Sequence, residues 1–150
     1  MDWKMLSDRE FAEALEICEM PNEYFHHLDH VRLAWIYLRG MPEEDAKERI
    51  ATTLKRFAAH NGRPERYHHT RTLAWMQLVG AAARTTPAIK TFAEFISAHP
   101  HLADQQTLLL HYSKNLLDSP DARAGWVGPD LRSLPPPAPG MESRKVALPN

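Results

Sequence analysis

The spacing of apolar residues is the feature that most constrains the fold of this chain. Apolar side chains recur every three or four positions along most of its length, as in the run Ala46, Ile50, Leu54 and Phe57. Residues with this spacing lie along one face of an α-helix. No stretch shows the alternation of apolar and polar residues that a half-buried strand requires. The pattern predicts an all-α fold, a single compact bundle of about six helices.

Residues with capping preferences predict where several of these helices begin and end. Ser7 and Glu10 have the spacing of a capping box, and the helix they open is expected to end before Pro21. Gly40 and the pair Asn61-Gly62 are placed to end the next two helices. The first helix is expected to bury Phe11, Ala14, Leu15 and Cys18. Further helices are expected over 70–83, 86–99 and 102–116, and a short turn or helix over 119–126.

Length and composition indicate one globular domain with a short extension. The chain has 150 residues, of which 43% are hydrophobic and 25% are charged, and these values are ordinary for a globular protein. Three consecutive prolines, Pro135 to Pro137, cannot continue a helix. We therefore expect a helical domain over 1–134 and an extended, flexible, proline-rich tail over 135–150.

Charge and cysteine content argue against several classes of partner and location. The formal net charge is −1 and no basic stripe is present, so neither nucleic acid nor membrane is an expected partner. The single cysteine, Cys18, excludes an internal disulfide and fits a reducing cytosol. The N-terminus does not resemble a secretion signal, which favours a cytoplasmic protein. A homodimer formed through Trp3, Trp126 and the tail stays open.

Five of the nine histidines stand ahead of two copies of a Leu-Ala-Trp phrase. The first cluster is His26, His27 and His30, and the second is His68 and His69. Two clusters placed alike on two expected helices are typical of a shared metal site. They are equally typical of a polar rim at the edge of a hydrophobic core.

His27 and His30 form the preferred chelating pair. Residues three apart share a helix face, with side-chain origins about 5–6 Å apart, and two imidazoles can bind one metal ion across that distance. Their face continues to Ala34 and Tyr37, beside an apolar stripe where a pocket can form. That stripe consists of Leu28, Val31, Trp35 and Leu38. His26 points about 100° away around the helix and is left out.

The second cluster is expected to supply one further ligand. His68 and His69 are adjacent and diverge around a helix, so only one of them points at a shared centre. We predict that His27, His30 and His68 bind a transition metal, because neutral nitrogen ligands suit iron, copper or zinc. His69 is predicted to be a fourth ligand or a catalytic acid/base, with Tyr37 and Tyr67 lining the pocket.

Several phrases resemble those of a family of small, uncharacterised bacterial helical proteins. They lie at residues 25–35, 67–70, 119–123 and 129–131, and the resemblance extends over most of 20–135. That family carries His-x-x-His before an Ala-Trp helix, then Tyr-His-Glu-Thr, and a closing Pro-Asp-Leu. The resemblance implies a site at His27, His30 and His68 and leaves out His26. Where the family usually has Glu, this chain has His69, which implies a site richer in nitrogen.

Two function classes follow from these residues. The leading hypothesis is a transition-metal-dependent enzyme that oxidises or hydrolyses a small molecule. The alternative is a metal-free helical module that binds a small ligand or a protein partner, with the histidines forming a polar rim. An acid/base enzyme without metal is a third class. Convergence of His27, His30 and His68 on one point favours the first class, and divergence favours the second.

Overall fold

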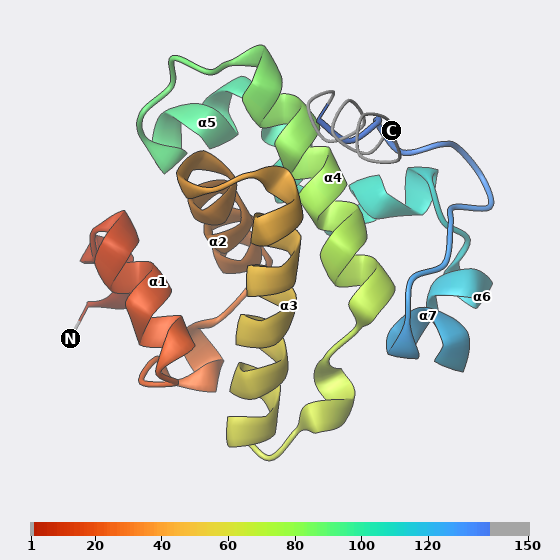
Figure 1. Ribbon diagram of the computed structural model, residues 1–150, viewed down its shortest axis with the longest axis horizontal. Coiled ribbons are helices and arrows are strands. Elements are labelled where there is room, and N and C mark those ends of the chain that lie inside the picture. The colour runs from red at the N-terminus through yellow and green to blue at the C-terminus, as the bar shows by residue number, and fades with distance from the viewer. Residues whose placement is uncertain (1, 139–150) are drawn as a thin grey trace, which may run out of the picture.

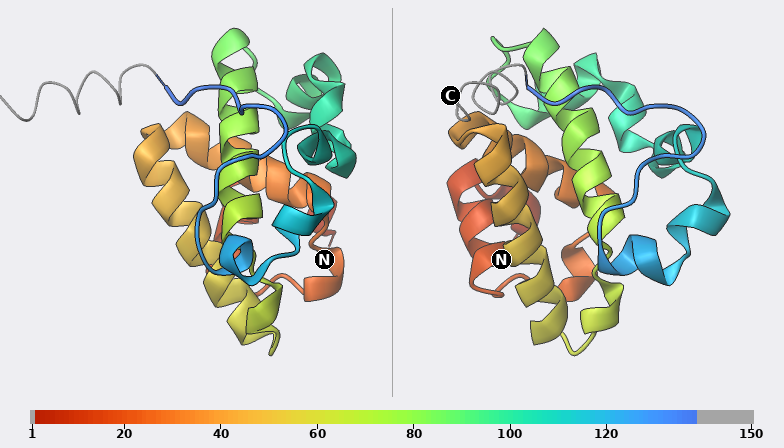
Figure 2. Two further views of the ribbon diagram at one scale, coloured as in Figure 1. Left: turned by 90° about the vertical axis from the view of Figure 1, so that its right-hand side faces the viewer. Right: turned by 45° about the vertical axis from the view of Figure 1, so that its right-hand side comes forward.

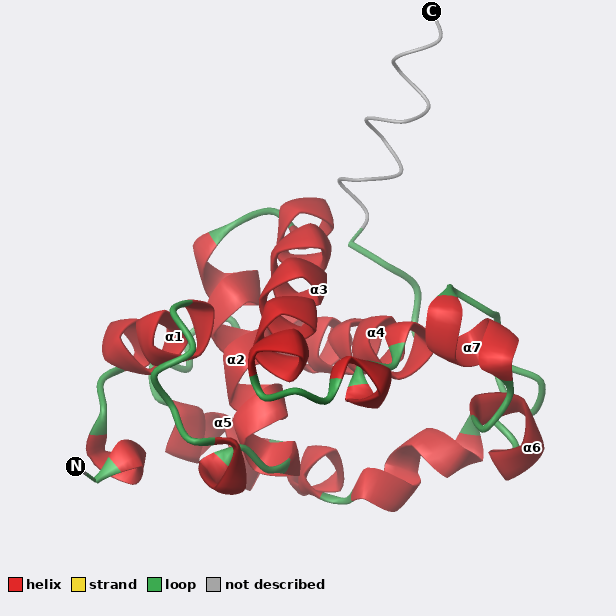
Figure 3. Cartoon of the chain, turned by 90° about the horizontal axis from the view of Figure 1, so that it is seen from below, coloured by secondary structure: helices red, strands yellow, loops and turns green. Residues whose placement is uncertain are grey.

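The structure is a computed structural model that describes residues 2–138, and its elements in this range are helices and loops without a strand (Figure 3). The all-α prediction is therefore confirmed. The α-helices are α1 (Asp8–Glu16), α2 (His27–Gly40), α3 (Glu43–His60), α4 (His69–Thr85), α5 (Phe92–Ala98), α6 (Lys114–Leu117) and α7 (Pro120–Ala124). The 3-10 helices are η1 (Trp3–Met5), η2 (Asn22–Tyr24), η3 (Pro64–Arg66), η4 (Pro100–Ala103) and η5 (Gln105–Leu110).

Helix α2 lies at the centre of the packing. It contacts α1, α3, α4 and η4, while α7 packs on α4 at the far side of the molecule (Figure 1). The two Leu-Ala-Trp phrases lie on α2 and α4, and their tryptophans, Trp35 and Trp75, are buried. In the part of the chain that the structure describes, no helix is both long and apolar enough to cross a membrane.

The apolar stripe of α2 differs from the predicted one. Leu28 is 42% exposed, whereas Leu33 and Tyr37, which lie off that stripe, are buried. Leu28 stands in the first turn of α2, and Leu33 and Tyr37 lie further along the helix. Helix α2 has helical neighbours on several sides. Residues in the middle of α2 are therefore buried on more than one face of the helix.

The end of α1 is also different from the expectation. The prediction that Cys18 belongs to the buried helical stripe is wrong, because α1 ends at Glu16 and Cys18 has a positive φ of 61°. The amides of Cys18 and Glu19 donate to the carbonyls of Leu15 and Ala14, at 3.1 and 2.8 Å. This is a Schellman motif, in which glycine is the usual residue at the left-handed position.

After α4, side-chain caps set the boundaries. The helix expected from residue 86 begins at Phe92 instead, since the Thr91 side chain accepts the amide of Glu94. The helix expected over 102–116 is divided into η4, η5 and α6. Asp104 and Ser113 accept amides at the starts of η5 and α6, at 2.9 and 3.2 Å. Such bonds compete with a continuous helix, which explains the division.

The first part of the predicted tail is attached to α4. Gln77 Nε2 donates to the carbonyl of Pro135 at 3.1 Å, and Arg84 Nη2 donates to that of Pro136 at 2.7 Å. Figure 2 shows this segment passing along α4. Residues 135–138 are thus extended, as expected, but held by side chains. The rest of the predicted tail, 139–150, lies outside the described residues.

Candidate functional site

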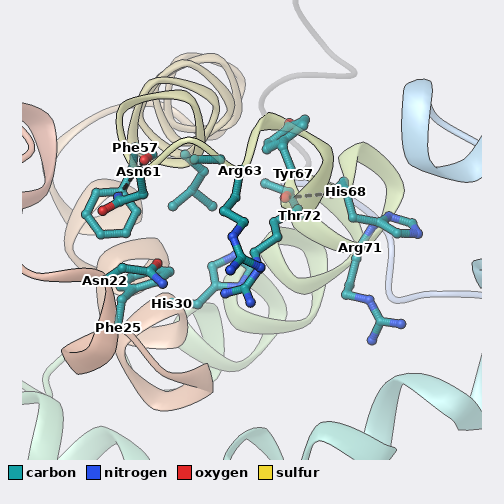
Figure 4. Close-up of a pocket in the computed structure, with 13 residues that line it drawn as sticks. Asn22, Phe25, His30, Phe57, Asn61, Arg63, Tyr67, His68, Arg71 and Thr72 are labelled. Atoms are coloured by element: carbon teal, nitrogen blue, oxygen red, sulfur yellow. Dashed lines mark hydrogen bonds between the residues drawn. The ribbon is translucent and has the colours of Figure 1, made fainter.

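A cavity of about 230 Å³ opens where the starts of α2 and α4 meet the end of α3 and η3 (Figure 4). Of the predicted metal ligands, His30 and His68 line this cavity and His27 does not. The lining residues are Asn22, Phe25, His30, Leu54, Phe57, Ala58, Asn61, Arg63, Arg66, Tyr67, His68, Arg71 and Thr72.

His27 is directed into the protein rather than into the cavity. Its Nε2 lies 2.9 Å from the carbonyl oxygen of Leu102, so this nitrogen carries a proton and donates it. The ring packs edge-on against Trp75 with centroids 4.5 Å apart. Burial lowers the pKa of His27. The imidazole is therefore neutral at pH 7 and serves to join α2 to η4.

Both nitrogens of His68 are used by the fold. His68 is the N-cap of α4, where its Nδ1 accepts the amide of Arg71 at 3.0 Å. Its Nε2 donates to the carbonyl of Leu117 at 2.7 Å. The side chain is thus held in one tautomer by two hydrogen bonds, and it ties the start of α4 to the end of α6.

His30 is the predicted ligand with an unpartnered nitrogen. The residue is half-buried, and its Nε2 is fully buried without a hydrogen-bond partner among residues 2–138. Burial lowers the pKa of His30 to about 4, and the charge of Arg71, with that of His27 once it is protonated, acts in the same direction. The imidazole is therefore neutral at physiological pH.

The described residues do not gather the predicted metal ligands. Within residues 2–138, no group of three or more His, Cys, Asp or Glu side chains is arranged to hold a metal ion. Binding a metal through Nε2 of His27 or His68 would break a hydrogen bond to a carbonyl oxygen. Leaving one such acceptor buried and unpaired costs about 1–3 kcal/mol. Convergence on one metal would therefore need rearrangement at α2 and α4.

Tyr37, predicted to line the pocket, lies elsewhere. Its hydroxyl donates to Glu16 at 2.6 Å and lies 3.0 Å from the hydroxyl of Thr53, so it is buried between α1, α2 and α3. Burial raises its pKa. Tyr37 lies on the same face of α2 as His30, as the spacing predicts. It is seven residues further along the helix, however, and at 1.5 Å per residue this puts it about 10 Å from His30 along the helix axis. The cavity does not extend that far.

Tyr67 lines the cavity, whereas His69 faces a different groove. The Tyr67 hydroxyl lies 2.8 Å from Nδ1 of His69. Burial raises the pKa of Tyr67 to about 12, so the phenol stays protonated. His69 itself lies in a groove against Lys55 and Thr52 of α3. Of the two adjacent histidines, His68 therefore reaches the cavity directly and His69 only through Tyr67.

Three arginines that sequence reasoning missed give the cavity its charge. Arg63, Arg66 and Arg71 line it, and no carboxylate does. None of the three forms an ion pair within the described range. Arg71 is half-buried, and burial lowers its pKa. A signal was present in the sequence: Arg63 and Arg66 flank the pair Pro64-Glu65 directly after the helix-ending Gly62, which has a φ of 70°.

The opposite wall of the cavity is apolar. Phe25, Leu54, Phe57 and Ala58 form it, and the rings of Phe25 and Phe57 lie with centroids 5.4 Å apart. Asn61 donates its amide to the Phe57 carbonyl at 2.7 Å, which leaves the side-chain oxygen of Asn61 available. The cavity therefore combines cationic groups, a neutral imidazole and an apolar surface.

Comparison with protein-family models, with curated proteins and with solved structures gives no match for this chain. The resemblance to small bacterial helical proteins therefore stays a prediction.

Proposed function

We propose that this protein is a binding module for a small organic anion with an apolar part. The observation that carries the proposal is a cavity lined by Arg63, Arg66 and Arg71 and by no carboxylate, with the Arg63 side chain extending toward His30 (Figure 4). This develops the alternative from the sequence, a metal-free helical module with histidines at its binding site.

The chemistry of arginine supports an anion rather than a neutral ligand. The planar guanidinium presents a fork of donors that matches a carboxylate or phosphate group. The first turn of α4 also borders the cavity through Arg71 and Thr72, and the positive end of the helix dipole favours an anion there. Together these features attract a negative group to the mouth of the cavity.

The size and the walls of the cavity restrict the remainder of the ligand. Its volume of about 230 Å³ lies below the roughly 300–1,000 Å³ of sites for drug-sized molecules. The aromatic rings of Phe25 and Phe57 offer a surface for hydrocarbon rather than for a polar chain. A short-chain or single-ring organic acid meets both requirements.

Calorimetry with matched acids and amides tests this proposal. Hexanoate and benzoate should bind at least about tenfold more tightly than hexanamide and benzamide, because a carboxylate accepts charge-assisted hydrogen bonds from guanidinium groups and an amide does not. Replacing both Arg63 and Arg66 by glutamine should remove that difference. Arg9→Gln is the control, since Arg9 is exposed and pairs with Glu13 on α1. Acids that bind no better than their amides would overturn the proposal.

A metal-dependent enzyme remains the second candidate. The observation in its favour is the unpartnered Nε2 of His30, one helical turn from His27. Elemental analysis of protein purified without a histidine tag separates the two candidates. The binding-module proposal predicts less than about a tenth of an equivalent of iron, copper or zinc, unchanged after incubation with each metal. A full equivalent lost in His30→Ala would favour the enzyme.

A further inference from the structure

Three segments of the chain each bring one aromatic ring to the cavity. Phe25 directly follows η2, Phe57 lies in the last turn of α3, and Tyr67 directly follows η3. All three residues line the cavity, together with the aliphatic side chains of Leu54 and Ala58. The cavity therefore offers aromatic as well as aliphatic surface to the apolar part of a bound acid.

We propose that the apolar part of the ligand is an aromatic ring, so that the protein prefers an aromatic carboxylate to a saturated one of the same size. The inference rests on the proposed function, since the carboxylate of this acid is the anion that Arg63 and Arg66 attract. The ring of the ligand then lies against Phe25 and Phe57.

The geometry of Phe25 and Phe57 favours an aromatic neighbour. Their ring planes are inclined at 58°, with centroids 5.4 Å apart. A third ring that contacts both cannot be parallel to both, so it meets at least one of them at an angle. Aromatic rings prefer such tilted contacts, because the positive edge of one ring approaches the negative face of the other. A saturated ring lacks this charge distribution and gains only from the burial of its surface.

The Arg63 side chain favours an aromatic ring for a second reason. In the view of Figure 4, Phe25 and Phe57 lie on one side of Arg63, and Tyr67 and His68 lie on the other. A ligand ring against Phe25 and Phe57 is therefore close to Arg63. A guanidinium group is attracted to the negative face of an aromatic ring, and a saturated ring has no such face.

A matched pair of acids separates these contacts from simple burial. Benzoate and cyclohexanecarboxylate have the same charge and the same number of carbon atoms. The saturated acid carries at least as much apolar surface, so burial alone would make it bind as tightly as benzoate or more tightly. Aromatic contacts favour benzoate instead, by about 2- to 10-fold in affinity. The direction of the preference therefore tests the inference.

Calorimetry on the full chain at neutral pH, where both acids are ionised, measures the two affinities. The native protein should bind benzoate at least about twofold more tightly than cyclohexanecarboxylate. In Phe25→Leu this preference should be lost or reversed, because leucine keeps the wall apolar without an aromatic ring. Phe92→Leu is the matched control, since Phe92 is also half-buried, contacts the ring of Trp35 and lies outside the cavity.

A second measurement locates the ligand ring without a substitution. Leu54 and Ala58 belong to the same wall of the cavity as Phe57. An aromatic ring beside them shifts their methyl resonances through its ring current, whereas a saturated ring does not. At equal saturation, benzoate should therefore shift the methyl signals of Leu54 and Ala58 more strongly than cyclohexanecarboxylate does.

The outcomes separate this inference from the proposed function. Cyclohexanecarboxylate bound as tightly as benzoate, with both affinities still dependent on Arg63 and Arg66, would overturn the aromatic preference and leave the anion site intact. A preference that survives in Phe25→Leu would overturn the position assigned to the ring. Failure of both acids to bind would overturn the anion site itself. If Phe25→Leu does not fold, the affinities of the native protein and the methyl shifts decide the question.

Discussion

At the scale of single residues, the imidazole of His30 should make stability depend on pH. Its pKa is about 4 in the folded chain, against an ordinary value of 6.5. Between these values the unfolded chain binds a proton that the folded chain does not, so stability is full above pH 6.5 and falls as the pH approaches 4. At 1.36 kcal/mol per unit, the loss is about 3 kcal/mol.

Urea unfolding at pH 7.5 and pH 4.5 measures this effect. Lower pKa values at His27 and His68 act in the same direction, so His30→Asn should reduce the difference between the two pH values without abolishing it. A native protein and a His30→Asn variant with parallel pH dependence would show that the His30 pKa is not depressed.

At the scale of secondary-structure elements, His68 decides how α4 begins. His68→Ala removes the N-cap of α4 and leaves the Leu117 carbonyl without its donor. We expect a loss of about 2–4 kcal/mol, the sum of a cap and an unpaired buried acceptor. His68→Asn can still cap the helix and should lose less. The measurement is the free energy of unfolding in urea.

The neighbouring histidine provides the control for this experiment. His69 is less buried than His68, and its one side-chain hydrogen bond among the described residues joins it to Tyr67. His69→Ala should therefore change stability by less than about 1 kcal/mol. Equal effects of the two substitutions would contradict the structural role assigned to His68.

At the scale of the whole molecule, the two ends of α4 should be independent. The start of α4 borders the cavity, while Gln77 and Arg84 further along hold the carbonyls of Pro135 and Pro136. Removing residues 135–150 should lower the unfolding free energy by about 1–3 kcal/mol, the worth of two hydrogen bonds. The affinity for hexanoate should not change. Altered affinity in the shortened chain would show that the segment acts on the cavity.

Local chemistry made much of the fold predictable. The capping box of Ser7 and Glu10 and the stop at Gly62 were read correctly, because each depends on residues a few positions apart. The boundaries of the later helices were predicted wrongly. There, side-chain caps such as those of Asp104 and Ser113 start new short helices where the apolar spacing predicted one continuous helix. At the site, His30 and His68, predicted as metal ligands, and Tyr67, predicted to line the pocket, all line the cavity, whereas Tyr37 lies elsewhere.

The sequence by itself determined that the chain is helical and that histidines stand at the starts of α2 and α4. Periodicity and capping are local properties, and both are written in short stretches of residues. Only the tertiary structure decided what those histidines do. It placed the carbonyl oxygens of Leu102 and Leu117 against His27 and His68, and it placed His30 in a cavity that Arg63 also lines. Hydrogen bonds between residues far apart in the chain depend on packing, which residue spacing alone does not specify.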